Sequence, residues 1–222
     1  MKLLLTSAGI SNVSIQNALV ELLGKPISES SALFVPTAIY GIAGGGDIVR
    51  KVICGVLGDP FCDLGWRSLG LLELTALPTM KQELWVPILH QTDALLVGGG
   101  DCQYLTYWMQ QSGLADLLPS LGEKVWVGLS AGSMVMTPRI GQTFVEWKSP
   151  DGGDKTLGIV DFSIFPHLNN PDLPQNTLTN AEKWAAEVQV PAYAIDDETA
   201  IKVVDGTVEV ISEGHWKLLK SS

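Results

Sequence analysis

The sequence predicts an α/β fold in which a mostly parallel sheet is covered by helices on both faces. Short apolar runs alternate along the chain with longer segments that have the apolar spacing of helices. The apolar runs are nearly continuous, as expected for strands that are buried on both faces. With 46% hydrophobic residues over 222 positions, the chain can bury a substantial core. Together these observations favour strands that are connected through helices.

The first 130 residues contain the clearest elements. The predicted strands are residues 2–6, 32–35, a run within 66–74, 94–97 and 125–127. The predicted helices are residues 13–23, 47–56, 80–90, 102–111 and 114–121. Pro36 stops the second strand, and Gly113 separates the last two helices.

After about residue 140 the pattern changes to short alternating segments. Residues 142–147, 192–195, 200–204 and 207–211 are predicted strands that complete or flank the sheet. Gly206 suits a hairpin turn between the last two. Because no repeat, low-complexity tract or linker interrupts the chain, we expect a single domain over residues 1–222.

Composition and charge argue against several classes of protein. The formal net charge of −10 argues against a nucleic-acid partner, since phosphate binding calls for a basic patch. No apolar run approaches the roughly 18 residues that would span a membrane, and residues 1–6 resemble a first strand more than a signal peptide. The three cysteines are an odd number without metal-ligand spacing, which favours a reducing compartment. We therefore expect a cytoplasmic protein, either a monomer or a homodimer.

The motif Gly128-Leu129-Ser130-Ala131-Gly132 is the most informative stretch of the chain. It follows an apolar run, and Ala131 and residues 134–136 suit a helix. A serine at a sharp turn from strand to helix is the layout of a nucleophile elbow, in which glycines leave room for the tight turn. An ordinary glycine-rich turn is the alternative, but the flanking elements favour a catalytic serine.

A second glycine-rich segment, Gly98-Gly99-Gly100-Asp101, ends the fourth predicted strand. Next to an elbow serine, its N–H groups would form half of an oxyanion hole, with Gly99 or Gly100 as one donor and Ala131 as the other. A phosphate cradle is the weaker alternative, because the segment lacks the spacing of nucleotide-binding loops. The similar run Gly44-Gly45-Gly46 is interpreted as a loop and helix start.

A serine nucleophile needs a base, and the chain offers three histidines. His167 is the best candidate, because it follows the strand-like run 162–166 and precedes a polar loop. His90 ends a predicted helix, where a positive charge is favourable, and His215 lies in a polar turn. For the carboxylate that orients the base, Asp197 ranks ahead of Glu146, although either could be a turn residue or lie on a solvated strand.

Three segments resemble the peptidase E family of serine peptidases, family S51, which comprises aspartyl dipeptidases and, more distantly, cyanophycinases. These segments are residues 99–108, 128–133 and 165–167, in the family's order. The resemblance extends roughly from the first strand to residues 196–201. It implies a three-layer α/β/α, flavodoxin-like fold similar to class I glutamine amidotransferases, with a serine elbow in place of the usual cysteine.

The resemblance also implies roles for individual residues. Ser130 would be the nucleophile, His167 the base, and Gly99 and Ala131 the oxyanion donors. The third member would be an acid within Asp196-Asp197-Glu198, or Glu146 as an acid that follows the nucleophile. The implied reaction is hydrolysis of a short peptide, and it needs no metal or organic cofactor.

Substrate preference is where this chain departs from the family pattern. Asp101 stands where the family usually has Asn, and its negative charge would oppose an acidic substrate. The nearby cations Arg139, Lys148 and Lys155 match no family specificity position. Preference for an N-terminal Asp is therefore left open.

Two other functions are compatible with the same residues. An esterase of the α/β-hydrolase type would use Ser130, Asp197 and His215 in that chain order. A binding protein without catalytic activity would hold a small ligand between residues 98–101 and Ser130.

Overall fold

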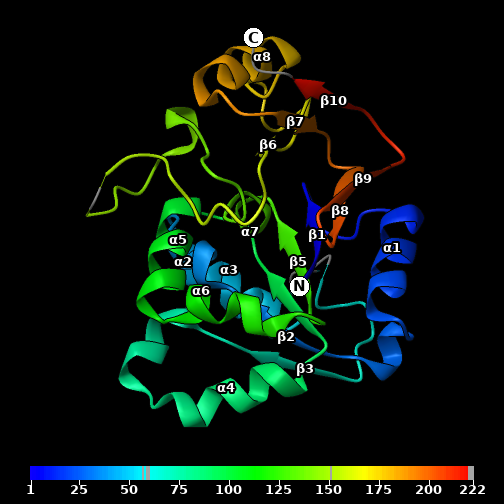
Figure 1. Ribbon diagram of the computed structural model, residues 1–222, viewed down its shortest axis with the longest axis vertical. Helices are drawn as coiled ribbons and strands as arrows, with labels where there is room; N and C mark the ends of the chain where they lie inside the picture. The colour runs from blue at the N-terminus through cyan, green and yellow to red at the C-terminus, as the bar shows by residue number, and fades with distance from the viewer. Residues whose placement is uncertain (57, 59–60, 151, 220–222) are drawn as a thin grey trace.

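The structure is a computed structural model that describes residues 1–56, 58, 61–150 and 152–219. Its largest element is a seven-stranded sheet (Figure 1). In sheet order the strands are β3 (Ser68–Leu71), β2 (Ser31–Val35), β4 (Ala94–Val97), β5 (Val125–Leu129), β1 (Lys2–Thr6), β8 (Thr199–Val204) and β9 (Thr207–Ser212). The first five are parallel, whereas β8 and β9 are antiparallel to their neighbours.

Helices cover both faces of this sheet and make the fold a three-layer α/β/α arrangement. One face packs against α4 (Gln82–Gln91), α5 (Cys102–Gln111), α6 (Leu114–Leu117) and α7 (Ala131–Met134), and the other against α1 (Val13–Leu23) and α3 (Gly45–Ile53). The strand periodicity of two divides the core accordingly: Leu3 and Leu5 face the first group, and Leu4 faces the second. Among the described residues, no helix combines the length and the apolar character needed to span a membrane.

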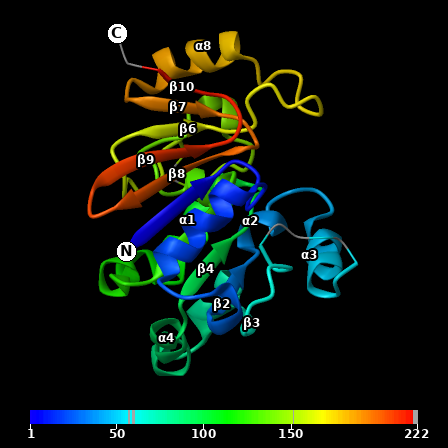
Figure 2. The same cartoon turned by 90° about the vertical axis from the view of Figure 1, so that its right-hand side faces the viewer.

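A second, three-stranded sheet lies at one end of the molecule, above the end of the large sheet (Figures 1 and 2). It has the order β10 (Trp216–Leu219), β7 (Ala192–Ile195), β6 (Ser163–Phe165) and packs against α8 (Leu178–Val188). Phe165 and Trp184 meet edge to face in the small core between this sheet and α8. The chain then returns from β7 to β8 of the large sheet through residues 196–198.

Most predicted elements are confirmed. The strands at 2–6 and 94–97 and the helices at 13–23 and 102–111 have the predicted bounds, and the hairpin at Gly206 joins β8 to β9. The predicted helices at 47–56 and 80–90 are shifted, to α3 and α4. The third strand differs from the expected buried type, because β3 is the edge strand and is exposed along its length.

The strand predicted at 142–147 is wrong. This segment contains the 3₁₀ turn η4 (Gln142–Phe144) and then irregular chain. Within the described chain, none of its backbone hydrogen bonds reaches a neighbouring strand. The Phe144 and Val145 N–H groups donate to carbonyls within the turn, the Gln142 N–H donates to Glu187, and the Trp147 N–H donates to Asp101. The segment therefore has the apolar alternation of a strand but does not pair with a neighbouring strand.

The helix after Ser130 is shorter than expected, and some elements, such as α2 (Thr37–Tyr40), were not predicted. Helix α7 ends at Met134 because the carbonyls of Val135 and Met136 accept hydrogen bonds from the segment 157–160. Helix α8 and strand β10 were missed, although the buried residues of α8 have helical spacing: Ala181, Trp184, Ala185 and Val188.

Candidate active site

The candidate site is built at the carboxyl ends of the central parallel strands. Thr6 at the end of β1 is paired with Leu129 of β5, and Val97 at the end of β4 is paired with Gly128. The residues that follow these strands therefore gather at one edge of the sheet, the usual position of ligand sites in such folds. These residues are Ser7, Gly98–Asp101 and Ser130.

Ser130 lies at a strained turn between β5 and α7. Its φ of 49° and ψ of −107° are rare for a residue with a side chain. A Cβ atom on Gly132 would overlap the carbonyl oxygen of Val97, and one on Gly128 would overlap the carbonyl oxygen of Gly132. The glycines on both sides of Ser130 are therefore required by close backbone approach, as the elbow interpretation predicts.

Hydrogen bonds from the elbow to β1 hold this strained turn in place. The Ser130 N–H donates to the Thr6 carbonyl at 3.0 Å, and the Ser133 hydroxyl donates to the same oxygen at 2.7 Å. The Trp126 indole N–H donates to the Gly132 carbonyl at 2.8 Å inside the core. The direction of the Ser130 side chain is thus set by buried contacts outside the cleft.

His167 follows β6 and Pro166 and has a left-handed φ of 56°. Its Nδ1 atom lies 2.6 Å from Oδ1 of Asp197, which is the second residue after β7. Because β6 and β7 are parallel neighbours, their carboxyl ends bring these two residues together. With Nδ1 donating to Asp197, the Nε2 atom of His167 is left as the proton acceptor.

Two further polar side chains contact Asp197. The Ser7 hydroxyl donates to Oδ1 at 2.8 Å, and the Asn170 amide donates to Oδ2 at 2.5 Å. Partial burial raises the pKa of Asp197, but the hydrogen bond and charge of His167, with the bonds from Ser7 and Asn170, outweigh burial and lower the pKa to about 2. Asp197 is therefore ionised at neutral pH and favours the protonated form of the His167 ring when it accepts a proton.

Ser130 and His167 line one cleft of about 470 Å³. Its other lining residues are Ile42, Gly100, Asp101, Cys102, Met134, Thr143, Phe144, Glu146, Pro166, Leu173, Gln175 and Asn176. This volume lies within the range of small-molecule pockets, roughly 300–1,000 Å³. Ser130 and His167 form no direct hydrogen bond in the structure, and catalytic hydrogen bonds often shorten only when substrate binds.

The backbone around Ser130 offers unpaired donors. Within the described part of the chain, the N–H groups of Gly99 and Ala131 donate to no protein acceptor. Gly99 also lies beside the nucleophile, since a Cβ built on it would be 3.5 Å from the Cβ of Ser130. Both N–H groups are therefore free to donate hydrogen bonds to a substrate oxygen, as an oxyanion hole requires.

Asp101 is buried and serves the fold. Its Oδ1 accepts from the Tyr104 N–H at 2.7 Å and caps α5, and its Oδ2 accepts from the Trp147 N–H at 2.7 Å. Both carboxylate oxygens are thereby held by backbone donors. Asp101 lines the cleft and also has a structural role, in which it anchors the loop that carries Glu146.

Glu146 is not brought to the histidine. It lies on the lining of the cleft, exposed, and forms no hydrogen bond or ion pair with any residue that the structure describes. Of the two acids considered as the carboxylate that orients His167, Asp197 and not Glu146 lies beside the histidine. The neighbouring Glu198 is also exposed, and its carboxylate accepts from Asn12.

The other two histidines and the cysteine of the cleft lie in surroundings that do not suit catalysis. His215 is 92% exposed and lies 3.7 Å from Asp196, not from Asp197, which removes the basis for the esterase alternative. His90 lies in the last turn of α4, as expected for a favourable helix-end charge. Burial, followed by the nearby charge of Asp101, raises the pKa of the Cys102 thiol far above its usual range, so this cysteine stays protonated in the cleft.

Sequence reasoning missed Ser7 and Asn170. Ser7 directly follows β1, and a polar residue at the carboxyl end of a central strand is a signal that could have identified it. Asn170 lies in the polar loop after His167 that was noted only as a loop. Its contact with Asp197 depends on the folded path of that loop, which no local pattern reveals.

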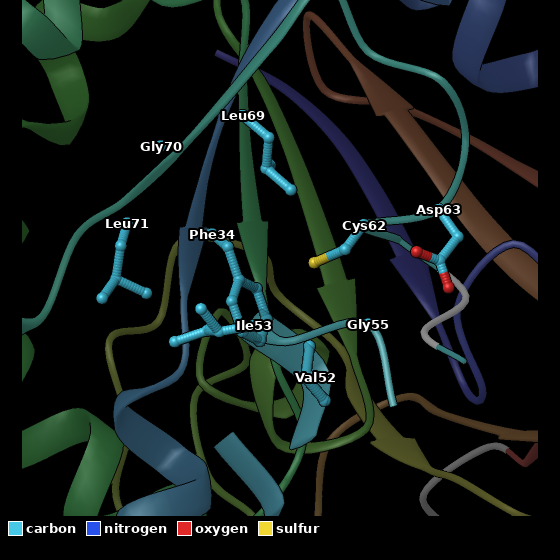
Figure 3. A pocket seen from close by; sticks show the side chains of 9 residues that line it. All are labelled: Phe34, Val52, Ile53, Gly55, Cys62, Asp63, Leu69, Gly70 and Leu71. Carbon is cyan, nitrogen blue, oxygen red and sulfur yellow. The ribbon is translucent and has the colours of Figure 1, made fainter. Parts of the chain in front are cut away.

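A second cavity, of about 250 Å³, lies away from this chemistry beside the edge strand β3 (Figure 3). Its lining comes from β2, β3 and α3 and from Gly55, Cys62 and Asp63, and among the described residues it shares none with the cleft. Figure 3 shows the Cys62 thiol facing the space near Phe34 and Leu69. The described lining residues are mostly apolar and include neither serine nor histidine, so the cleft at Ser130 remains the candidate active site.

Comparison with known proteins gives a family match over most of the chain. The model of peptidase family S51 matches residues 3–211. An uncharacterized peptidase of Listeria monocytogenes serovar 1/2a, Lmo0363, is 29% identical over 143 residues, which are 61% of this chain and 68% of that protein.

Two crystal structures share the fold. A Listeria monocytogenes EGD-e protein assigned to peptidase E has a TM-score of 0.69 and 20% identity, over 96% of this chain and 98% of that one. A peptidase from an acI-B1 Actinobacterium has a TM-score of 0.70 and 19% identity, over 100% of this chain and 91% of that one. These structures confirm the predicted α/β fold, and the family match over nearly the whole chain confirms the resemblance: the chain belongs to peptidase family S51, a family of serine peptidases.

Proposed function

We propose that this chain hydrolyses short peptides, with Ser130 as nucleophile, His167 as general base and Asp197 as the acid that orients the base. The observation that carries the proposal is the 2.6 Å contact between His167 Nδ1 and Asp197 Oδ1, on the same cleft as the strained Ser130 turn. A nucleophile, a base and an orienting carboxylate are the parts of serine acyl transfer.

In the proposed reaction, Nε2 of His167 takes the proton from the Ser130 hydroxyl. The Ser130 oxygen then bonds to the carbonyl carbon of the substrate, and the negative charge on the carbonyl oxygen is stabilised by the N–H groups of Gly99 and Ala131. The imidazolium gives its proton to the leaving amine as the C–N bond breaks. Water, deprotonated by His167, then attacks the acyl carbon. The bond to the Ser130 oxygen breaks, His167 returns the proton to that oxygen, and the acid product is released.

A fluorophosphonate reagent tests this proposal without knowledge of the substrate. We expect intact-mass analysis to show one adduct per chain, and peptide mapping to locate it at Ser130. The Ser130→Ala and His167→Ala proteins should lose labelling, whereas Ser120→Ala, at an exposed serine, and His215→Ala should label like the wild type. Labelling that survives Ser130→Ala, or is lost in His215→Ala, would contradict the assignment.

Hydrolysis of a dipeptide panel is the second test. Asp197→Asn should lower kcat by roughly 10³–10⁴-fold, because an amide neither stabilises the imidazolium nor fixes the productive tautomer. Equal activity of Asp197→Asn and wild type would contradict the role of Asp197 as the acid that orients His167, but not the role of Ser130 as the nucleophile.

A further inference from the structure

Apart from His167, the Asp, Glu, Lys and Arg side chains found among the described lining residues of the cleft are all acidic. Among the described residues of the lining, Asp101 and Glu146 are carboxylates, and neither Lys nor Arg occurs. An acidic side chain of a substrate is recognised best by a guanidinium or ammonium group. The cleft has no such group to offer among these lining residues.

The three cations considered from the sequence are placed elsewhere. Arg139 is held by Asp154 through two hydrogen bonds of 2.9 Å. Lys155 lines a different, polar pocket, and Lys148 is not part of the cleft lining. None of them is available in the cleft to neutralise a substrate carboxylate.

Glu146 differs from Asp101 in having a free carboxylate. Both oxygens of Asp101 are occupied by backbone donors, whereas the Glu146 carboxylate has no partner in the described part of the chain. It is therefore the charged group of the lining that can accept hydrogen bonds from a ligand without breaking an existing contact.

The backbone beside Glu146 is fixed. Asp101 binds the N–H of Trp147, and the Trp147 ring packs edge to face on Tyr104 at 5.5 Å and against Tyr107 at 5.4 Å. Because Asp101 also caps α5, the loop is tied to a rigid element directly beside the Gly98–Gly100 turn. Glu146 is thus held at the cleft wall by its neighbour, and less entropy is lost when it binds a ligand.

We infer that Glu146 binds a cationic nitrogen of the substrate, so that the chain prefers short peptides with a neutral or basic first residue over peptides that begin with an acid. The nitrogen is either the α-ammonium group or the ammonium group of a basic side chain. This inference rests on the proposed function, since it assumes that peptides are processed at Ser130.

The test uses the full chain with Lys-Leu, Ala-Leu and Asp-Leu, together with N-acetylated Lys-Leu and Ala-Leu. We expect kcat/KM to fall in the order Lys-Leu, Ala-Leu, Asp-Leu when a side-chain nitrogen is bound, and both neutral and basic members to exceed Asp-Leu in either case. Glu146→Gln should lower kcat/KM by roughly 10- to 100-fold for the recognised substrates, mainly through KM, because a charge-assisted hydrogen bond is lost. Glu83→Gln, an exposed carboxylate on α4, removes the same charge and should change nothing.

The acetylated substrates and the Glu146→Gln variant together distinguish binding of the α-ammonium group from binding of the side-chain nitrogen. If the α-ammonium group is bound, N-acetylation should cause the same loss as Glu146→Gln, and the variant should have no further effect on acetylated substrates. If the side-chain nitrogen is bound, Glu146→Gln should remove the difference between Lys-Leu and Ala-Leu.

Other outcomes contradict the inference. These are Asp-Leu as the best substrate, a Glu146→Gln protein with unchanged kcat/KM throughout, or no turnover of any member while Ser130 still reacts with fluorophosphonate. Loss of that labelling as well would instead contradict the proposed function.

Discussion

The hydroxyl of Ser7 accepts a hydrogen bond from the backbone N–H of His167 at 2.7 Å. The same hydroxyl donates to Asp197 at 2.8 Å, so a fully buried residue at the end of β1 contacts both proposed partners of the nucleophile. Ser7 is not itself a lining residue of the cleft, and we regard it as a positioning residue that acts through His167 and Asp197.

Replacing Ser7 by Ala should lower kcat by roughly 10- to 100-fold and leave KM unchanged, because the orientation of His167 is disturbed and its N–H loses its partner. The pKa of Asp197 should also rise, since one of its hydrogen bonds is gone. Steady-state kinetics and the pH dependence of stability measure the two effects. Wild-type kcat in Ser7→Ala, with Ser120→Ala as the control, would rule out a positioning role.

The Asp197 carboxylate should stabilise the fold at neutral pH. Its folded pKa of about 2 lies below the ordinary value of 3.8, so the stabilisation is fully present above about pH 4 and is lost as the pH falls toward 2. The difference in free energy of unfolding between wild type and Asp197→Asn should therefore shrink over this interval. Urea unfolding of both proteins between pH 7 and pH 2 measures it, and a difference that stays constant or grows on acidification would contradict the lowered pKa.

The elbow glycine Gly132 should tolerate no side chain. Gly132→Ala places a methyl group against the Val97 carbonyl, and we expect a loss of about 3 kcal/mol or more in the free energy of unfolding. Gly122→Ala is the matched control, because its Cβ would meet no atom within 4 Å and its φ of −44° suits alanine. It should change stability by less than about 1 kcal/mol, in the stabilising direction. Thermal unfolding that ranks the two variants equally would contradict the steric explanation of the motif.

The sequence was most informative where local signals and burial agree. The strand-turn-helix around Ser130 could be predicted because the glycine spacing is a direct consequence of backbone contacts that only glycine permits. Helix α1 was predicted at its observed bounds from its apolar spacing. In the structure Asn12 caps it and Gly24 ends it in a left-handed conformation.

Elements whose hydrogen-bond partners lie far away in the sequence were harder to predict. The 142–147 segment has apolar alternation, but its Gln142 and Trp147 N–H groups are bound by Glu187 and Asp101, which no local pattern identifies. The choice between Asp197 and Glu146 also required the folded chain, because it depends on the parallel pairing of β6 with β7. The small sheet itself was not anticipated as a separate unit.

The two sheets divide the proposed machinery between them. Ser130 is carried by the large sheet, whereas His167 and Asp197 follow strands of the small one. During synthesis a growing chain thus contains its nucleophile before the base and the acid have left the ribosome. In the proposed mechanism, such a nascent chain cannot cleave peptides until its last third has been made and has docked, so the order of synthesis itself delays proteolysis until folding is complete.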